Sequence, residues 1–223
     1  MSAFFVTATG TDIGKTYVTA GLLRHLRREG ASAIKPVASG FTAETAAVSD
    51  PVQLLEAMGE AVTAETLARI SPWRFAEPLS PDMAAAREGR AIDFDALVEF
   101  CRARVFRAKG PLFVEGVGGV MVPLNAHHTT RDWMAALGFP VVLVAGSYLG
   151  TISHTLTALD VLARVRLRVA ALVVNETADS AVPLEETMAT LGRFAGAVPI
   201  VALRRAAADT EFAALWRVLC AAA

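Results

Sequence analysis

The sequence has few of the features that mark secreted, membrane or nucleic-acid-binding proteins. Cysteine occurs only at Cys101 and Cys220, far apart in apolar, helical-looking segments. We therefore expect two buried free thiols in a reducing compartment rather than a disulfide framework. No apolar run approaches the roughly 20 residues that span a bilayer, and no secretory leader is recognisable. The formal net charge of −1 gives no broad attraction for nucleic acid or membrane, so a cytoplasmic protein is expected.

The abundant residues predict a folded α/β protein. Of 223 residues, 54% are hydrophobic and 19% charged, enough for one well-buried domain over residues 1–223. Apolar runs alternate with segments of helical periodicity, which predicts a mostly parallel, doubly wound central sheet flanked by helices. The predicted strands are residues 3–8, 32–36, 111–115, 140–145, 169–175 and 198–202; the predicted helices are residues 15–28, 51–58, 81–87, 94–108, 130–137, 151–164, 184–194 and 211–221. The proline-rich residues 71–81 read as an ordered irregular loop.

Residues 9–16, Thr-Gly-Thr-Asp-Ile-Gly-Lys-Thr, lie between the first predicted strand and the first predicted helix. Gly14 allows the backbone to turn tightly against an anion, and the amides that lead into the helix favour phosphate. Lys15 can reach the β- and γ-phosphates, and the Thr16 hydroxyl can ligate Mg²⁺. The strict pattern has glycine at position 9, and here glycine comes one place later. The context still predicts a three-layer P-loop NTPase fold that binds a nucleoside triphosphate.

Polar residues follow the other predicted strands, whose carboxyl ends meet at the sheet edge where ligands bind. Glu115 is either a ligand of Mg²⁺ or a solvated residue of a glycine-rich turn. Lys35 either neutralises charge during phosphoryl transfer or lies on the surface, and Ser39 beside it could hydrogen-bond a substrate. Asp50 is either a helix N-cap or a second carboxylate for the metal. Asn175 either reads a base edge or is a simple turn residue.

Several longer motifs together resemble the dethiobiotin synthetase family, nearly from end to end. They are Phe-Val-Thr at 5–7 with Gly-Lys-Thr at 14–16, Lys-Pro-Val-Ala-Ser-Gly at 35–40, Ser-Asp at 49–50, Phe-Ala-Glu-Pro-Leu-Ser-Pro at 75–81, Val-Glu-Gly-Val-Gly-Gly at 114–119, Leu-Gly at 149–150 and Val-Asn at 174–175. The resemblance implies an ATP- and Mg²⁺-dependent cyclo-ligase of biotin biosynthesis. CO₂ would add to one amine of 7,8-diaminononanoate as a carbamate, and ATP would phosphorylate it to a carbamic-phosphoric anhydride. The second amine would then close the ureido ring, giving dethiobiotin, ADP and phosphate.

The resemblance also implies roles for single residues around the phosphates. Lys35, Lys15 and Thr11 would line the reacting groups. Mg²⁺ would be held by Thr16, Asp50 and Glu115. The residues implied in binding the nucleotide are Asp12, Ile13, Gly14, Lys15, Thr16, Tyr17, Asp50, Glu115, Gly116, Val117, Gly118 and, against adenine, Asn175.

Three further residues are implied in binding the diamine. Ser39 would contact the diamine or its carbamate, while Gly150 and Ser153 would lie at the start of a helix that meets the substrate carboxylate. Many relatives carry asparagine where Ser153 stands. Relatives are homodimers with the active site at the subunit interface, so a homodimer is expected here as well.

Two other functions compete with the ligase interpretation. A dimeric P-loop switch that hydrolyses ATP to change partners often carries an extra lysine early in the loop, but no lysine precedes Lys15 in this chain. Such a switch also leaves the Lys-Pro-Val-Ala-Ser-Gly motif unexplained. A related amidotransferase-type synthetase acting on a corrin precursor would need a glutaminase domain with a nucleophilic cysteine, for which 223 residues leave no room.

Overall fold

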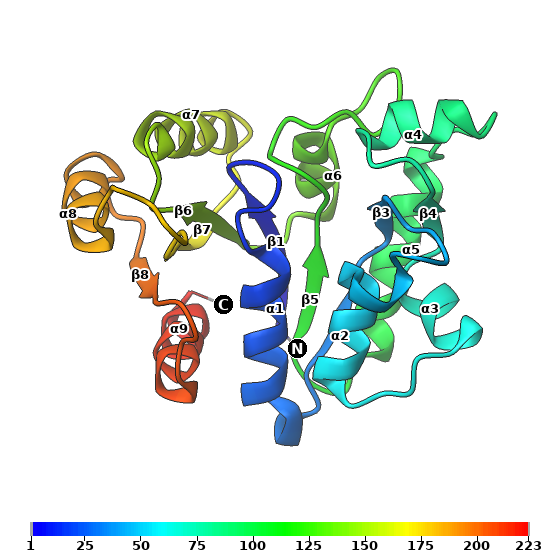
Figure 1. Cartoon of the computed structure of the whole chain (residues 1–223), viewed down its shortest axis with the longest axis horizontal. Helices are drawn as coiled ribbons and strands as arrows, with labels where there is room; N and C mark the ends of the chain where they lie inside the picture. The colour runs from blue at the N-terminus through cyan, green and yellow to red at the C-terminus, as the bar shows by residue number, and fades with distance from the viewer. Residues whose placement is uncertain (1, 223) are drawn as a thin grey trace.

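The computed structural model describes residues 2–222 and contains the predicted parallel sheet (Figure 1). Every pair of neighbouring strands in this sheet is parallel. The strands are β1 (Ala3–Ala8), β2 (Ser32–Ile34), β5 (Leu112–Glu115), β6 (Val141–Gly146), β7 (Val169–Asn175) and β8 (Ile200–Leu203), in the order β2-β5-β1-β6-β7-β8. The predicted α/β class is confirmed.

Helices follow most strands and flank the sheet (Figure 1). Along the chain, the helical elements are α1 (Lys15–His25), η1 (Arg27–Glu29), η2 (Ala46–Val48), α2 (Asp50–Met58), α3 (Ala64–Ile70), α4 (Pro81–Arg87), α5 (Phe94–Arg107), α6 (Thr130–Leu137), α7 (Thr151–Arg164), α8 (Leu184–Phe194) and α9 (Asp209–Ala221). Helix α1 packs against α2 and α9, α5 against α6, and α7 against α8. Within residues 2–222, no helix is both long and apolar enough to cross a membrane.

A small second sheet was missed by the sequence pattern. Strands β3 (Val37–Ser39) and β4 (Trp73–Phe75) pair in parallel beside the main sheet. The prediction of an irregular loop over residues 71–81 is therefore wrong, because this segment contains β4 and ends where α4 begins. Each strand has only three residues, too few to show an alternating pattern, and each is stabilised by a partner more than 30 residues away.

Helix α3 was also missed, and its start explains why. Thr63 caps the helix by accepting a hydrogen bond from the backbone of Thr66, whose hydroxyl in turn accepts one from the backbone of Thr63. The usual signature of such a capping box has glutamate or glutamine at the second position. A threonine pair in a segment of only seven helical residues gives a weak sequence signal.

The two cysteines differ in environment. Cys101 lies on α5 and is buried, and burial raises the pKa of its thiol from 9.0 to about 12. Cys220 lies in the last turn of α9 and is exposed, so the expectation of two buried thiols is wrong for this residue. The buried face of α9 is made by Phe212, Leu215 and Leu219, and a residue directly after Leu219 points to another side of the helix.

A dense core under β1 fixes the strand ends from which the site is built. The rings of Phe5 and Trp133 meet edge to face with centroids 4.8 Å apart, and neither side chain is exposed. Burial of a large apolar side chain contributes roughly 2 kcal/mol. The strands therefore leave the core in fixed positions, with the phosphate loop after β1, Glu115 at the end of β5 and Asn175 at the end of β7.

Candidate nucleotide and metal site

The loop between β1 and α1 depends on one glycine in a left-handed conformation. Gly14 caps α1 with φ 100° and ψ 26°, a region in which a side chain is strained. A Cβ atom at Gly14 would also lie 2.3 Å from Nδ2 of Asn175. That same amide donates a hydrogen bond of 3.0 Å to the carbonyl of Ile13. Glycine at this position therefore serves both the backbone turn and the close contact with β7.

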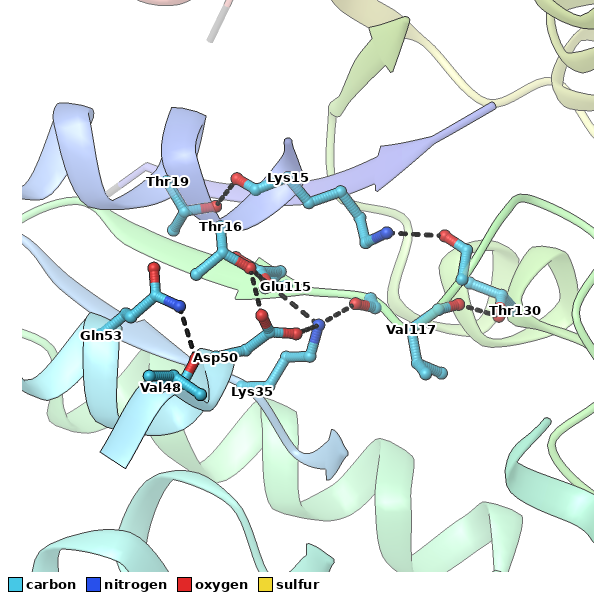
Figure 2. Close-up of polar contacts among 12 residues, drawn as sticks. Lys15, Thr16, Thr19, Lys35, Val48, Asp50, Gln53, Glu115, Val117 and Thr130 are labelled. Atoms are coloured by element: carbon cyan, nitrogen blue, oxygen red, sulfur yellow. Dashed lines mark hydrogen bonds and ion pairs between the residues drawn. The ribbon is translucent and has the colours of Figure 1, made fainter. Parts of the chain in front are cut away.

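Lys15 begins α1 and points across the loop toward the segment after β5 (Figure 2). Its ammonium donates to the carbonyl of Gly118 at 3.0 Å and lies 3.4 Å from that of Gly10. Burial, followed by the nearby charge of Lys35, lowers the pKa of Lys15 from 10.5 to about 8. A lysine held only by neutral carbonyls in a buried place is ready to pair with an anion such as phosphate.

Four side chains converge beside Lys15 (Figure 2): Thr16 from α1, Lys35 from the segment between β2 and β3, Asp50 from α2 and Glu115 from β5. The ammonium of Lys35 contacts carboxylate oxygens of Asp50 and Glu115, each at 2.8 Å, and the carbonyl of Gly116 at 2.7 Å. The hydroxyl oxygen of Thr16 lies 2.8 Å from Oδ1 of Asp50 and 2.8 Å from Oε1 of Glu115. One hydroxyl has a single proton to donate, so it can satisfy only one of these two oxygens.

The charges in this cluster stabilise one another. Burial alone would lower the pKa of Lys35, but Glu115 and Asp50 more than offset it, and the pKa is raised above 10.5. Burial alone would raise the pKa of Asp50, but the ammonium of Lys35 and the hydroxyl of Thr16 hold it below its usual value of 3.8. Lys35 is 2% exposed and Glu115 is fully buried, so both surface alternatives left open by the sequence are wrong.

The N-cap alternative for Asp50 is wrong as well. Ser49 occupies the N-cap position of α2, and Asp50 is the first residue of the helix, followed by Pro51. Proline is favoured in the first turn because its missing N–H would have no helical partner. The carboxylate of Asp50 is consequently free to turn toward Lys35 and Thr16 rather than toward its own helix.

The donor set of this cluster fits Mg²⁺. The hydroxyl oxygen of Thr16 lies 2.8 Å from one carboxylate oxygen each of Asp50 and Glu115, so three hard oxygens are gathered here, and Oε2 of Glu115 is buried with no hydrogen-bond partner among the described residues. Residues 2–222 contain no group of three or more His, Cys, Asp or Glu side chains that could hold a metal. Mg²⁺ does not need such a group, because it is usually bound by one or two carboxylates together with water and substrate phosphates.

A cavity of about 860 Å³ opens directly above the cluster. It is lined by most of the residues that sequence analysis assigned to phosphate, metal or substrate. These are Thr11, Asp12, Gly14, Lys15, Thr16, Lys35, Ser39, Asp50, Val117 and Gly118. The hydroxyl oxygen of Ser39 is buried without a hydrogen-bond partner among the described residues, which leaves it available to a ligand.

Other predicted residues lie outside the cavity lining. Glu115 and Gly116 are not in the lining but contact residues that are: Oε1 of Glu115 lies 2.8 Å from Lys35 and from Thr16, and the carbonyl of Gly116 accepts from Lys35. The carbonyl of Ile13 accepts a hydrogen bond from the side-chain amide of Asn175. The hydroxyl of Tyr17 accepts a hydrogen bond from the backbone of Ala207, which ties α1 to the segment after β8. Gly150, the left-handed N-cap of α7, and Ser153 in its first turn are both exposed.

The apolar half of the cavity was not predicted from the sequence. Phe41 and Val48 from the segment after β3, Pro78 and Leu79 before α4, and Val122 after β5 also line it, together with Ala38, Gly40, Thr45, Ser49, Pro51, Ser80 and Pro81. The segments after β3 and after β4 are brought together by the β3–β4 pairing, a long-range contact that no local motif reveals. The one local signal was Pro78 and Leu79 within the motif at residues 75–81, which carries their position in the chain but not their neighbours.

The fold and the phosphate loop together define a P-loop NTPase, and comparison with known proteins agrees. The model of the AAA domain family matches residues 2–204. Among solved structures, a ParA family ATPase from Chlorobium tepidum has a TM-score of 0.53 at 14% identity, with 98% of this chain and 88% of that chain covered. The septum site-determining protein MinD from Pyrococcus horikoshii has a TM-score of 0.51 at 14% identity, over 91% and 81%. At such identities the likeness concerns the fold alone.

Sequence relatives are more specific. The ATP-dependent dethiobiotin synthetase BioD of Acidiphilium cryptum is 56% identical over 202 residues, which cover 89% of this chain and 91% of the relative. The enzyme of the same name from Phenylobacterium zucineum is 48% identical over 92% of this chain and 89% of the relative. The chain belongs to the ATP-dependent dethiobiotin synthetase family and is an ATP-dependent ligase, as the resemblance in its motifs indicated.

Proposed function

We propose that the chain carboxylates and cyclises 7,8-diaminononanoate with CO₂ and ATP, giving dethiobiotin, ADP and phosphate. One amine adds to CO₂ and loses a proton, forming a carbamate. A carbamate oxygen accepts the γ-phosphoryl group of ATP while ADP leaves. The second amine attacks the carbonyl carbon of this mixed anhydride, phosphate leaves, and the ureido ring closes. The observation that carries the proposal is the cluster of Lys15, Thr16, Lys35, Asp50 and Glu115 at one end of a large cavity.

Lys15 and Lys35 are assigned to the negative charge that builds up during phosphoryl transfer. Both ammonium groups are nearly fully buried, and fixed charges in a site with little water stabilise a transition state strongly because they need no reorganisation. Among residues 2–222, the hydrogen-bond partners of the Lys15 ammonium are carbonyl oxygens, and Lys15 is assigned to the β- and γ-phosphates. Lys35 lies farther toward the acceptor end of the cavity and is assigned to the reacting carbamate and phosphoryl oxygens.

Thr16, Asp50 and Glu115 are the proposed holders of Mg²⁺. When bound, the metal would neutralise phosphate charge and orient the triphosphate. The three side chains contribute a preformed group of hard oxygens, and Glu115 is placed by the buried end of β5 without freedom to move. The other carboxylate oxygen of Glu115, Oε2, is buried with no hydrogen-bond partner among the described residues, which supports a cation at this point.

Binding of the phosphoryl acceptor is assigned to Thr11 and Ser39, and binding of the adenine base to Asn175. Thr11 and Ser39 both line the cavity, and the hydroxyl oxygen of Ser39 is buried without a hydrogen-bond partner among the described residues. Asn175 lies beyond the opposite side of the loop, on β7, where its amide also holds the carbonyl of Ile13. The triphosphate then runs along the loop, with adenine toward β7 and its γ-phosphate toward Lys35 and Asp50.

A homodimer is proposed as the working form. Gly150 and Ser153 lie on an exposed α7 N-terminus outside the cavity of their own chain, next to Leu149, which is 91% exposed. If they bind the substrate carboxylate, as assigned, a second subunit must bring them to it. Free backbone amides at a helix N-terminus are suited to a carboxylate.

The test is product formation by the purified protein. Incubation with ATP, Mg²⁺, bicarbonate and 7,8-diaminononanoate should give the cyclic urea, identified by mass spectrometry, and omission of any one component should abolish it. Turnover of ATP without diamine, combined with no cyclic urea when all components are present, would refute the proposed reaction.

A further inference from the structure

The cavity has two ends that differ in chemistry. One end carries the two lysines and the metal-binding oxygens, and the other is mainly apolar, formed by Phe41, Val48, Pro78 and Leu79, with the hydroxyl residues Thr45, Ser49 and Ser80 also in the lining. Phosphates belong at the charged end, and a charged group moved into the apolar end would lose hydration without compensation. The apolar end is therefore suited to the hydrocarbon part of a ligand.

The strand order of the sheet indicates which ligand places its hydrocarbon part in the apolar end of the cavity. The strands run β2-β5-β1-β6-β7-β8, so the cavity on the β2 and β5 side and Asn175 on β7 lie on opposite sides of the phosphate loop. A nucleotide whose base is directed toward β7 presents its γ-phosphate toward Lys35. The apolar end then lies beyond the γ-phosphate, on the acceptor side, and adenine is too far away to occupy it.

Phe41 is held firmly at this apolar end. It follows Gly40, whose φ of 72° turns the chain away from β3, and a Cβ atom at Gly40 would be 3.3 Å from the side chain of Pro78. The backbone N–H of Phe41 donates to the carbonyl of Phe75 at 2.9 Å, and that of Gly40 to Glu77 at 3.0 Å. The turn that presents the ring is thus bonded directly to the end of β4.

A cation supports the same ring. The guanidinium carbon of Arg74, on β4, lies 5.2 Å from the centroid of Phe41. Arg74 is itself fixed by hydrogen bonds from Nη1 to the carbonyls of Leu67 and Ser71, at the end of α3. An arginine over an aromatic face contributes roughly 0.5–2 kcal/mol, depending on exposure. Neither Phe41 nor Arg74 lies in a motif that sequence analysis used to assign substrate binding.

We propose that Phe41 determines specificity for the substrate chain and that Arg74 is a positioning residue that holds its ring. This inference rests on the proposed function. The ring of Phe41 packs against the methylene groups between the diamine and the carboxylate, while Lys35 and Ser39 hold the reacting end. A shorter chain, or a smaller side chain at position 41, leaves apolar surface uncovered and weakens binding of the diamine without altering the phosphate end.

The experiment compares steady-state constants of wild type, Phe41→Ala, Phe41→Leu, Arg74→Met and Arg74→Lys. Phe41→Ala should raise KM for the diamine about tenfold, the effect of losing part of a buried aromatic contact, with kcat reduced less and KM for ATP unchanged. Arg74→Met should raise KM for the diamine roughly threefold. Phe41→Leu and Arg74→Lys should restore most of the affinity.

A shortened substrate provides the second measurement. Against a homologue lacking two methylene groups, wild type should lose roughly fourfold in kcat/KM per methylene, and Phe41→Ala should lose clearly less. Arg104→Met is the matched control, because Arg104 makes the same kind of contact with Phe100, at 4.9 Å, on α5 and outside the cavity lining. It should leave both constants unchanged.

Each outcome bears on a different statement. No cyclic urea from wild type refutes the proposed function, and this inference with it. Cyclic urea from wild type, together with a wild-type KM and a wild-type chain-length preference in Phe41→Ala, refutes the role of Phe41 alone. Equal changes in Arg74→Met and Arg104→Met, or a change in KM for ATP equal to that for the diamine, would show that Arg74 acts only on general stability.

Discussion

The two ends of the cavity are built in opposite ways. At the charged end, Lys35 and Glu115 are fixed by ion pairs and by strands that are buried in the core. At the apolar end, Phe41 and Val48 lie on a surface segment after a three-residue strand, and Val48 is 72% exposed. The charged end is preorganised for phosphate, a group that every P-loop enzyme binds. Under the proposed assignments, chemistry and selectivity would be carried by separate parts of the fold.

Replacement of Lys35 should reduce turnover more than any other substitution proposed here. A smaller effect would contradict the assignment of the chemistry to the charged end. Lys35→Met removes a charge assigned to the transition state, so ring closure should fall by about a hundredfold or more, while binding of ADP changes little. The variant leaves the fully buried carboxylate of Glu115 without its cation, which destabilises the fold by roughly 3–5 kcal/mol; the Asp50 side chain is 43% exposed and adds little. Turnover and thermal unfolding should be measured together.

Lys109→Met is the matched control for Lys35→Met, because Lys109 is an exposed lysine outside the cavity lining. It should retain wild-type turnover and stability. If Lys35→Met folds and keeps wild-type turnover, Lys35 has no part in the chemistry.

Thr16 tests whether the charged end holds a metal. Thr16→Val keeps the shape of the side chain but removes one of the three clustered oxygens, so the concentration of Mg²⁺ needed for half-maximal turnover should rise roughly tenfold. Thr16→Ser, which restores the hydroxyl, should be close to wild type. An unchanged Mg²⁺ dependence in Thr16→Val would remove this residue from the metal site.

Gly14 tests the backbone of the phosphate loop. Gly14→Ala combines a left-handed backbone with a contact of 2.3 Å between the new Cβ atom and Asn175, so the affinity for ADP should fall at least about fivefold. Gly138→Ala provides the control, because Gly138 also has a positive φ of 68° but nothing lies within 4 Å of a Cβ atom there. Calorimetric titration with ADP should separate the two, and equal affinities would contradict the proposed packing of Asn175 on the loop.

The smallest effect is expected at the rim of the apolar end. Val48 is mostly exposed, so Val48→Thr removes little buried surface and should change KM for the diamine by less than about twofold. A change as large as that of Phe41→Ala would mean that the segment after β3 closes over the substrate. Phe41 and Val48 would then contribute equally to substrate binding, despite the exposure of Val48.

Almost all residues of the charged end could be predicted from the sequence, for a physical reason. Gly14, Lys15 and Thr16 are adjacent in the chain. Lys35, Glu115 and Asn175 each lie at or just after the end of a strand, and these carboxyl ends must lie at the same sheet edge. Local pattern and topology therefore suffice to bring them together. The structure added the partners: Asp50 is turned away from its own helix, and the side chain of Asn175 lies against Gly14.

The apolar end could not be derived in the same way. Phe41 and Arg74 are 33 positions apart and meet only because β3 pairs with β4, two strands too short to be recognised. The exposure of Cys220 escaped prediction for a related reason, since the burial of a small apolar residue depends on which helix face meets the core. Contacts between distant segments, rather than residue types, were the missing information.

The central claim is that ATP is consumed only to activate a carbamate of the diamine. The direct measurement is the ratio of ADP released to cyclic urea formed by wild-type protein, with and without 7,8-diaminononanoate. The account predicts one ADP per cyclic urea and almost no ADP without the diamine. ADP released at the same rate whether or not the diamine is present, as expected of an ATPase switch, would contradict it.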